Sequence, residues 1–145
     1  MTYLLDVNVL IALIDPRHVH HHPAHAWFGA EGHRSWATCP LVENGLLRIV
    51  GHPRYENFGG LPHQVAGMLA QLKINHPAHQ FWADEISILD ETIFDRAGML
   101  NSMHLTDIYL HGLARFKGGK LATFDGKFPR QVVRDGLDSV HLIAG

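Results

Sequence analysis

The chain has 145 residues, of which 46% are hydrophobic and 18% charged, and its formal net charge is −2 with the histidines neutral. This length is enough for one buried core and too short for two ordinary domains, so we expect a single domain over residues 1–145. The near balance of charge excludes a strongly basic field, so any contact with nucleic acid must use local patches.

Cysteine content and hydropathy indicate where the protein works. Cys39 is the only cysteine, which excludes an internal disulfide framework and fits a reducing compartment. No apolar run reaches about 18 residues, and the N-terminus carries Asp6 where a signal peptide would have basic and apolar regions. We therefore expect a cytoplasmic protein that does not span a membrane.

The first half of the chain predicts alternating strands and helices. Residues 3–5 are a short apolar run typical of a strand, and residues 9–14 are an apolar run of helical length that Pro16 ends. A histidine-rich loop follows, and Pro23 is expected near the start of a second helix. The other elements predicted here are a strand at 34–38, a helix from Pro40 to Val50 and a helix that begins at Pro62.

The second half contains a convincing helix and several short runs. The helix is expected over residues 106–116, with Gly118 and Gly119 beyond its end. Short strands are predicted at 79–82, 86–89, 120–123 and 140–143, and another helix at 91–99. This alternation favours the α/β class, with a parallel sheet covered on both faces by helices. Ligands of such sheets collect at the carboxyl ends of the strands.

Four acidic residues are predicted to meet at that edge of the sheet. Asp6 and Asp125 each follow a short apolar run, whereas Asp107 and Glu43 lie near the starts of predicted helices. Taken alone, each acid is more often a helix cap or a turn residue. Gathered in one cleft, carboxylates repel one another, and a divalent cation removes that conflict. Oxygen ligands suit Mg²⁺ or Mn²⁺, so the sequence predicts a site for phosphodiester hydrolysis.

The order and context of the four acids resemble a known family. The stretches concerned are LLDVNVLIAL (4–13), LVENGLLRIVGHPR (41–54), LTDIYLHGLA (105–114) and LATFDGKF (121–128). They are similar to the PIN-domain ribonucleases and, within these, to the VapC toxins of bacterial toxin-antitoxin pairs. The resemblance covers almost the whole chain. It implies a small α/β/α sandwich with a mostly parallel central sheet, and endoribonuclease activity with Mg²⁺ or Mn²⁺ at the acids.

The resemblance assigns roles to individual residues. The family's acidic, metal-binding positions correspond to the four acids named above. Its flanking polar positions correspond to Asn8, Thr106 and Thr123, which we expect to orient a carboxylate or a water molecule. Ordinary turn and capping roles explain these three residues about as well. The expected products carry a 3′-hydroxyl and a 5′-phosphate.

Partners are also implied by the resemblance. They are an RNA substrate, a second copy of the chain in a homodimer, and a cognate antitoxin that often inserts an arginine-bearing segment into the acidic site. Apolar residues that could lie at such interfaces are Leu61, Met68, Phe81 and Trp82. Core packing is the commoner use of residues of this type.

Basic residues near the acidic motifs are candidates for phosphate contacts. RNA binding needs local cations, and the candidates are Arg48, Arg54 and Lys127. The two arginines follow Glu43 and are the best placed. Basic residues on helices more often form a solvated face.

The chain has 13 histidines, and five of them crowd residues 18–25. His21 and His25 are four residues apart, so they could share a helix face and bind a transition metal. A solvated polar loop is the simpler interpretation, because no cysteine or carboxylate completes a set nearby. A third possibility is that these histidines line the entrance for RNA.

Three other functions stay open. A PIN nuclease that processes RNA without an antitoxin would use the same acids. A module that keeps the fold but binds RNA or protein without catalysis would not need all four. A phosphatase of the aspartyl-phosphate type also begins with an aspartate after a strand, but it has a second aspartate where this chain has Asn8.

Overall fold

A computed structural model describes residues 1–57 and 60–145 of the chain. Within these residues, five strands form one sheet in the order β3-β2-β1-β4-β5. The strands are β1 (Tyr3–Leu5), β2 (Trp36–Thr38), β3 (His79–Phe81), β4 (Lys120–Thr123) and β5 (Val140–Leu142). Every neighbouring pair is parallel, which confirms the predicted sheet.

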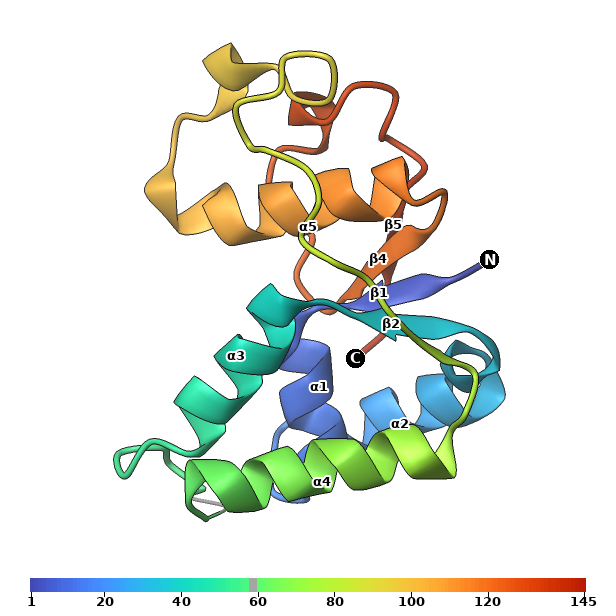
Figure 1. The fold of residues 1–145 in the computed structure, drawn as a ribbon, viewed down its shortest axis with the longest axis vertical. Helices are drawn as coiled ribbons and strands as arrows, with labels where there is room; N and C mark the ends of the chain where they lie inside the picture. Colours follow the sequence, from blue (N-terminus) through green and yellow to red (C-terminus); the bar gives the residue numbers. More distant parts are fainter. Residues whose placement is uncertain (58–59) are drawn as a thin grey trace.

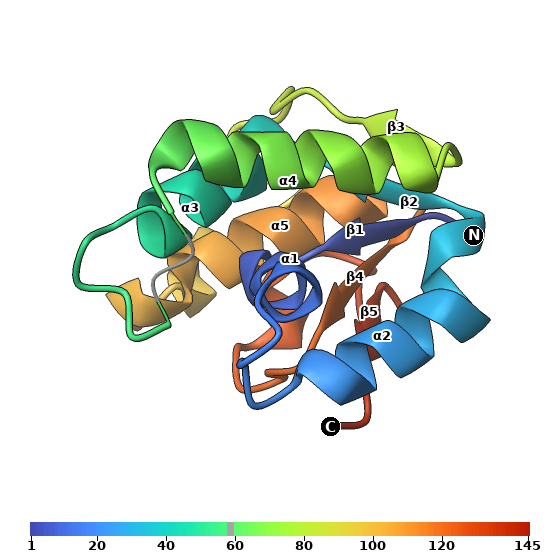
Figure 2. The same cartoon turned by 90° about the horizontal axis from the view of Figure 1, so that it is seen from below.

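Helices cover both faces of the sheet. They are α1 (Val7–Ile14), α2 (His21–Ala30), α3 (Pro40–Val50), α4 (Pro62–Asn75) and α5 (Leu105–Phe116). Figure 1 shows α5 on one face and the other four helices on the opposite face. Seen from below, α1 lies between α2 on one side and α3 and α4 on the other (Figure 2). The result is the predicted α/β/α sandwich.

The sheet forms the centre of the hydrophobic core. Its three middle strands contribute side chains that are completely buried: Leu4, Leu5, Trp36, Ala37, Leu121 and Ala122. Strands covered on both faces need apolar residues at successive positions, which explains why these short runs do not alternate. In the part of the chain that the structure describes, none of the helices is both long and apolar enough to cross a membrane.

The segment from residue 86 to residue 99 differs from the prediction. The expected strand at 86–89 and helix at 91–99 are both wrong: the chain makes turns, one short 3₁₀ helix at Arg96–Gly98 and a single antiparallel bridge between Phe94 and Val133. The Asp90 carboxylate accepts hydrogen bonds from both the backbone N–H and the hydroxyl of Thr92, a local alternative to helical bonding. The apolar residues pack instead in a second core cluster beside α5.

Two boundaries also differ. The helix α2 begins at His21, two residues before Pro23, so it takes in part of the predicted histidine-rich loop. The strand predicted from residue 34 begins at Trp36, because residues 32–34 form a 3₁₀ turn.

The strand order places a topological switch point at β1. From β1 the chain continues to β2 on one side of the sheet, whereas β4 lies on the other side. Ligands of open parallel sheets bind at such a switch point, outside the carboxyl ends of the strands. Asp6 directly follows β1, and Asp125 lies two residues beyond β4.

Candidate active site

Asp6 lies at the junction of β1 and α1, and its side chain is only 2% exposed. Thr123 Oγ1 donates a hydrogen bond to Asp6 Oδ2 at 2.8 Å. Burial raises the pKa of Asp6 above its ordinary value, and the charge of Asp125 raises it further. The Thr123 hydroxyl and the nearby N–H groups of Val7 and Asn8 oppose this shift and favour the charged form. The effect of burial is larger, so positive charge placed here would stabilise the Asp6 carboxylate.

Asp107 and Asp125 complete an acidic centre with Asp6. Asp107 lies in the first turn of α5, and its pKa is raised to about 7, first by burial and then by the charges of Asp6 and Asp125. Asp125 is exposed, and its Oδ1 accepts a hydrogen bond from the Lys127 N–H at 3.0 Å. Like charges shift one another in this way only at close range. We call these three aspartates the acidic centre.

Glu43 lies in the first turn of α3, but its carboxylate is bound by other groups. Glu43 Oε2 accepts hydrogen bonds from Thr38 Oγ1 at 2.6 Å and from Lys73 Nζ at 2.5 Å. His79 Nε2 lies 2.7 Å from Thr38 Oγ1, and burial and the Lys73 charge lower the pKa of His79 to about 4. Because the Thr38 hydroxyl donates to Glu43, the neutral His79 ring donates to Thr38.

The structure therefore brings three of the four predicted acids together and places the fourth in a neighbouring cluster. The charges that raise the pKa of Asp107 are those of Asp6 and Asp125, and Glu43 is not among them. Lys73 is the residue that sequence reasoning missed here. It lies 30 positions away from Glu43 in another helix, where its side chain is partly buried, and no motif or spacing links the two.

The three flanking polar residues have different surroundings. Thr123 is buried and contacts the acidic centre through Asp6, as described above. Asn8 and Thr106 are exposed, and neither side chain makes a hydrogen bond to the parts of the chain that the structure describes. Their predicted action on a bound water molecule remains a prediction.

The three predicted phosphate contacts lie in two places. Lys127 is exposed on the loop after β4, two residues beyond Asp125 and therefore beside the acidic centre. Arg48 lies in the last turn of α3, at the end opposite Glu43, and Arg54 lies beyond that helix. The geometry favours Lys127 over the two arginines as a phosphate ligand.

The acidic centre fits a hard divalent cation by its chemistry. Carboxylate oxygens are the ligands that Mg²⁺ and Mn²⁺ prefer, and a cation would relieve the repulsion that adds to burial in raising the pKa of Asp107. Among residues 1–57 and 60–145, no group of three or more His, Cys, Asp or Glu side chains is placed so that it could hold a metal ion. Mg²⁺ usually binds to one or two carboxylates and keeps several water molecules, so a set of three is not required.

Comparison with known proteins identifies the family, although no family model matches the chain. The Mycobacterium tuberculosis protein named ribonuclease VapC44 is 38% identical over 142 residues, which cover 98% of each chain. This chain belongs to the VapC ribonuclease family. In the same organism, VapC39 is 39% identical over 125 residues, which cover 86% of this VapC chain and 89% of the relative. VapC38 is 36% identical over 123 residues, or 84% of each chain.

A solved structure agrees with this VapC assignment at the level of the fold. The crystal structure of VapBC2 from Rickettsia felis bound to a DNA fragment from their promoter contains a similar chain, with a TM-score of 0.56. The match covers 99% of this chain and 100% of that chain at 13% sequence identity. The predicted resemblance to the VapC toxins is thus confirmed by the sequence relatives, and the predicted fold by the structure.

His21 and His25 have a structural use in this VapC chain. His21 Nδ1 lies 2.7 Å from the Ala12 carbonyl oxygen, and His25 Nε2 lies 2.8 Å from that of Leu13. These carbonyls belong to the last turn of α1, where no helical N–H is available to them. The two rings do share a face of α2, with centroids 4.4 Å apart, and one nitrogen of each contacts a carbonyl of α1. These contacts give both histidines a structural role in capping α1.

The predicted interface residues divide by exposure. Trp82 is 4% exposed and belongs to the core, whereas Leu61, Met68 and Phe81 are 55%, 40% and 55% exposed. Only the last three are therefore available for contact with a partner.

Proposed function

We propose that this VapC-family chain is the endoribonuclease toxin of a toxin-antitoxin pair and hydrolyses RNA with Mg²⁺ or Mn²⁺ at the acidic centre. The observation that carries the proposal is the gathering of three aspartates at the switch point of the sheet, where burial and then the charges of Asp6 and Asp125 raise the pKa of Asp107 to about 7. The names of the relatives, all ribonucleases, support the reaction.

The residues of the acidic centre have separable tasks in this proposal. Asp6 and Asp107 would hold the cation, with Asp125 at the solvent side, and Glu43 would join them by turning away from Lys73. Thr123 keeps the Asp6 carboxylate charged and correctly oriented through its hydrogen bond. When bound, the cation would supply a more acidic water and neutralise charge on the phosphate oxygens. Lys127 would bind a phosphate next to the bond that is cut.

The products follow from attack by water on phosphorus. A new bond joins the water oxygen to phosphorus, and the bond from phosphorus to the 3′-oxygen breaks. The attacking water loses a proton to solvent, and the departing 3′-oxygen gains one from solvent. Lys127, two residues beyond Asp125, is the basic side chain proposed to bind the charged phosphate. The expected products carry a 3′-hydroxyl and a 5′-phosphate.

We further propose the setting in which the enzyme works. Residues 1–145 would form a single nuclease domain, because the five strands share one sheet and one main core. We propose that this domain works in the cytoplasm, where RNA substrates are present. An antitoxin partner is supported by the Rickettsia felis neighbour, which is described as a VapBC complex. A homodimer is proposed from the family resemblance, with Leu61, Met68 and Phe81 available for either contact.

The nuclease is tested by cleavage of structured and single-stranded RNAs with added Mg²⁺ or Mn²⁺. We expect metal-dependent cleavage by the wild type and a loss of at least about 100-fold in D6N and in D107N, because each loses a charged ligand. Asp138→Asn, an exposed aspartate away from the acidic centre, is the matched control. Cleavage that is absent from the wild type, or unchanged in both variants, would reject the proposal.

The toxin is tested separately from the nuclease. Induced expression in bacteria should arrest growth, and the product of a neighbouring reading frame should relieve the arrest by binding the chain. If growth continues although the purified protein cleaves RNA, the alternative of an RNA-processing nuclease without an antitoxin is the better account.

A further inference from the structure

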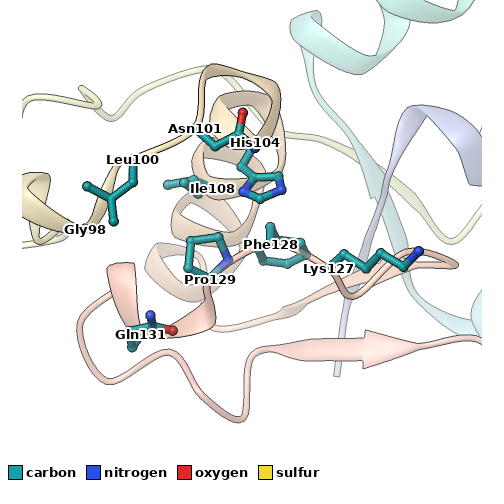
Figure 3. A pocket seen from close by; sticks show the side chains of 9 residues that line it. All are labelled: Gly98, Leu100, Asn101, His104, Ile108, Lys127, Phe128, Pro129 and Gln131. Carbon is teal, nitrogen blue, oxygen red and sulfur yellow. The ribbon is translucent and has the colours of Figure 1, made fainter.

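A hollow of about 390 Å³ opens beside the acidic centre, and Lys127 is the one residue of its lining that has a role in the proposed reaction (Figure 3). Its lining comes from the segment before α5, from α5 itself and from the loop after β4. Ile108, which follows Asp107, and Lys127, whose N–H binds Asp125, both contribute to it. The hollow and the acidic centre therefore share the start of α5 and the same loop.

The inner wall of the hollow is apolar and rigid. Ile108 and Phe128 are buried in the core at 0% and 4% exposure. Figure 3 shows Phe128 and Pro129 on one side of the hollow and the His104 ring and Ile108 on the other. Flat rings and apolar side chains are the surfaces on which proteins stack the unpaired bases of single-stranded RNA.

The rim of the hollow carries polar groups that can read the edge of a base. Asn101 Oδ1 accepts a hydrogen bond from the Met103 N–H, which leaves the Asn101 amide hydrogens free of this cap. Gln131 is exposed and makes no hydrogen bond to residues 1–57 or 60–145. Both side chains offer an amide, which can donate to and accept from the Watson–Crick edge of a base.

Charge distinguishes the hollow from the acidic centre beside it. None of its nine lining residues carries a carboxylate, and one of them is Lys127. Its volume falls within the range of about 300–1,000 Å³ that is typical of small-molecule sites. A nucleotide whose phosphate lies at the acids and Lys127 would have its base next to this lining.

We propose that the hollow is a nucleobase subsite that selects the RNA sequence at the cleavage position. The inference rests on the proposed ribonuclease function and adds its specificity. The half-buried His104 and Pro129 enclose the faces of the base above the buried floor of Ile108 and Phe128, and the exposed Asn101 and Gln131 contact its edge from the rim. Asn101 and Gln131 are specificity residues, not catalytic ones, because they lie away from the acidic centre.

The first test measures binding without cleavage, so it does not depend on the proposed reaction. The four nucleoside 5′-monophosphates are added to the protein in the absence of divalent cations, and the side-chain amide and imidazole signals are followed by NMR. We expect at least one nucleotide to shift the signals of Gln131 and His104. The variant Gln131→Trp, which fills the hollow from its rim, should abolish the His104 shift. Gln71→Trp on the exposed side of α4 is the matched control.

Three results would overturn the subsite. One is that no nucleotide shifts these signals. Another is that inorganic phosphate alone gives the same shifts, which would assign binding to Lys127 and not to a base. The third is that the signals move with protein concentration alone, because the exposed Leu100 and Met103 at this rim would then contact a second copy of the chain.

The second test reads the sequence preference of the enzyme. A random RNA pool is cleaved, and the bases that flank each cut are sequenced. We expect a preference at one position in the wild type and in Gln71→Ala, and a loss of at least about fivefold in that preference in Gln131→Ala. An unchanged preference in Gln131→Ala rejects the subsite while leaving the nuclease intact, whereas absent cleavage rejects the nuclease and leaves the binding result to decide the subsite.

Discussion

Thr123 at the end of β4 donates a hydrogen bond at 2.8 Å to the carboxylate of Asp6 at the end of β1, 117 residues away in the sequence. Both side chains are buried, and this bond lowers the pKa of Asp6 against the larger effect of burial. One hydroxyl thus joins the two strands at the switch point and helps to keep Asp6 charged.

The variant Thr123→Val should reveal the value of this bond. Loss of a hydrogen bond to a buried carboxylate typically costs about 1–3 kcal/mol in the free energy of unfolding. Loss of a group that orients a metal ligand typically weakens metal affinity about 10- to 100-fold. Denaturant unfolding and Mn²⁺ titration measure the two effects. Thr123→Ser keeps the hydroxyl and should stay close to the wild type; equal losses in both variants would contradict the prediction.

Asp107 should make the stability of the metal-free protein depend on pH. Its pKa in the folded protein is about 7, against an ordinary value of 3.8, so the folded state binds this proton more tightly than the unfolded state. The stabilising contribution is present at low pH and is lost as the pH rises toward and through 7. We expect Asp107→Asn to be more stable than the wild type at pH 8 and to approach it at pH 4.

Thermal unfolding from pH 4 to pH 8, with a chelator present, measures this difference. Asp138→Asn is the control for a general effect of charge. Added Mn²⁺ should stabilise the wild type and so reduce the difference in melting temperature between it and Asp107→Asn at pH 8. Parallel pH profiles for the wild type and Asp107→Asn would show that Asp107 does not titrate in this window.

Lys73 holds the Glu43 carboxylate, and its removal should favour metal binding. The ion pair is about a quarter exposed on both sides, with side-chain exposures of 28% and 26%. Partly exposed pairs contribute up to about 1 kcal/mol, so Lys73→Met should raise Mn²⁺ affinity by up to about fivefold if Glu43 joins the acidic centre. Lys73→Arg keeps the positive charge and should change little. An unchanged affinity in Lys73→Met would indicate that Glu43 stays in its own cluster.

The caps on α1 predict a stability effect without an effect on catalysis. His21→Phe and His25→Phe each leave a carbonyl of the last turn of α1 without its ring donor. We expect each variant to lose about 1 kcal/mol in the free energy of unfolding, with metal-dependent cleavage within about twofold of the wild type. His22→Phe, an exposed position on the same helix, is the control. A large loss of cleavage in either capping variant would favour a role for these histidines in RNA entry.

The sequence predicted the sheet better than the segments between its strands. Runs such as Leu4-Leu5 and Leu121-Ala122 are apolar at successive positions because both faces of the sheet are covered, and that pattern is visible without a structure. The segment at 86–99 has apolar residues too, but they fill a second cluster around Phe94. The packing of these residues around Phe94 depends on contacts with α5 and with Val132 and Val133, which are distant in the sequence. A local sequence pattern therefore cannot predict it.

The candidate site also has a part that the sequence predicts and a part that it does not. Asp6, Asp107 and Asp125 are held by the ends of β1 and β4 and the start of α5, so the element order already predicts that they meet. The direction of the Glu43 side chain depends on Lys73, and the hollow depends on how the segment before α5 and the loop after β4 pack together. Contacts of this kind arise from tertiary packing alone.

The first strand of the chain is also the central strand of the sheet, between β2 and β4. During synthesis, β1 therefore leaves the ribosome early but has a free edge until β4, near residue 123, has also emerged. Asp125 follows β4, so the acidic centre is complete only after β4 has joined the sheet. An enzyme proposed to cut RNA is thus made on an RNA machine as a nascent chain that has no assembled acidic centre until residue 125 has emerged.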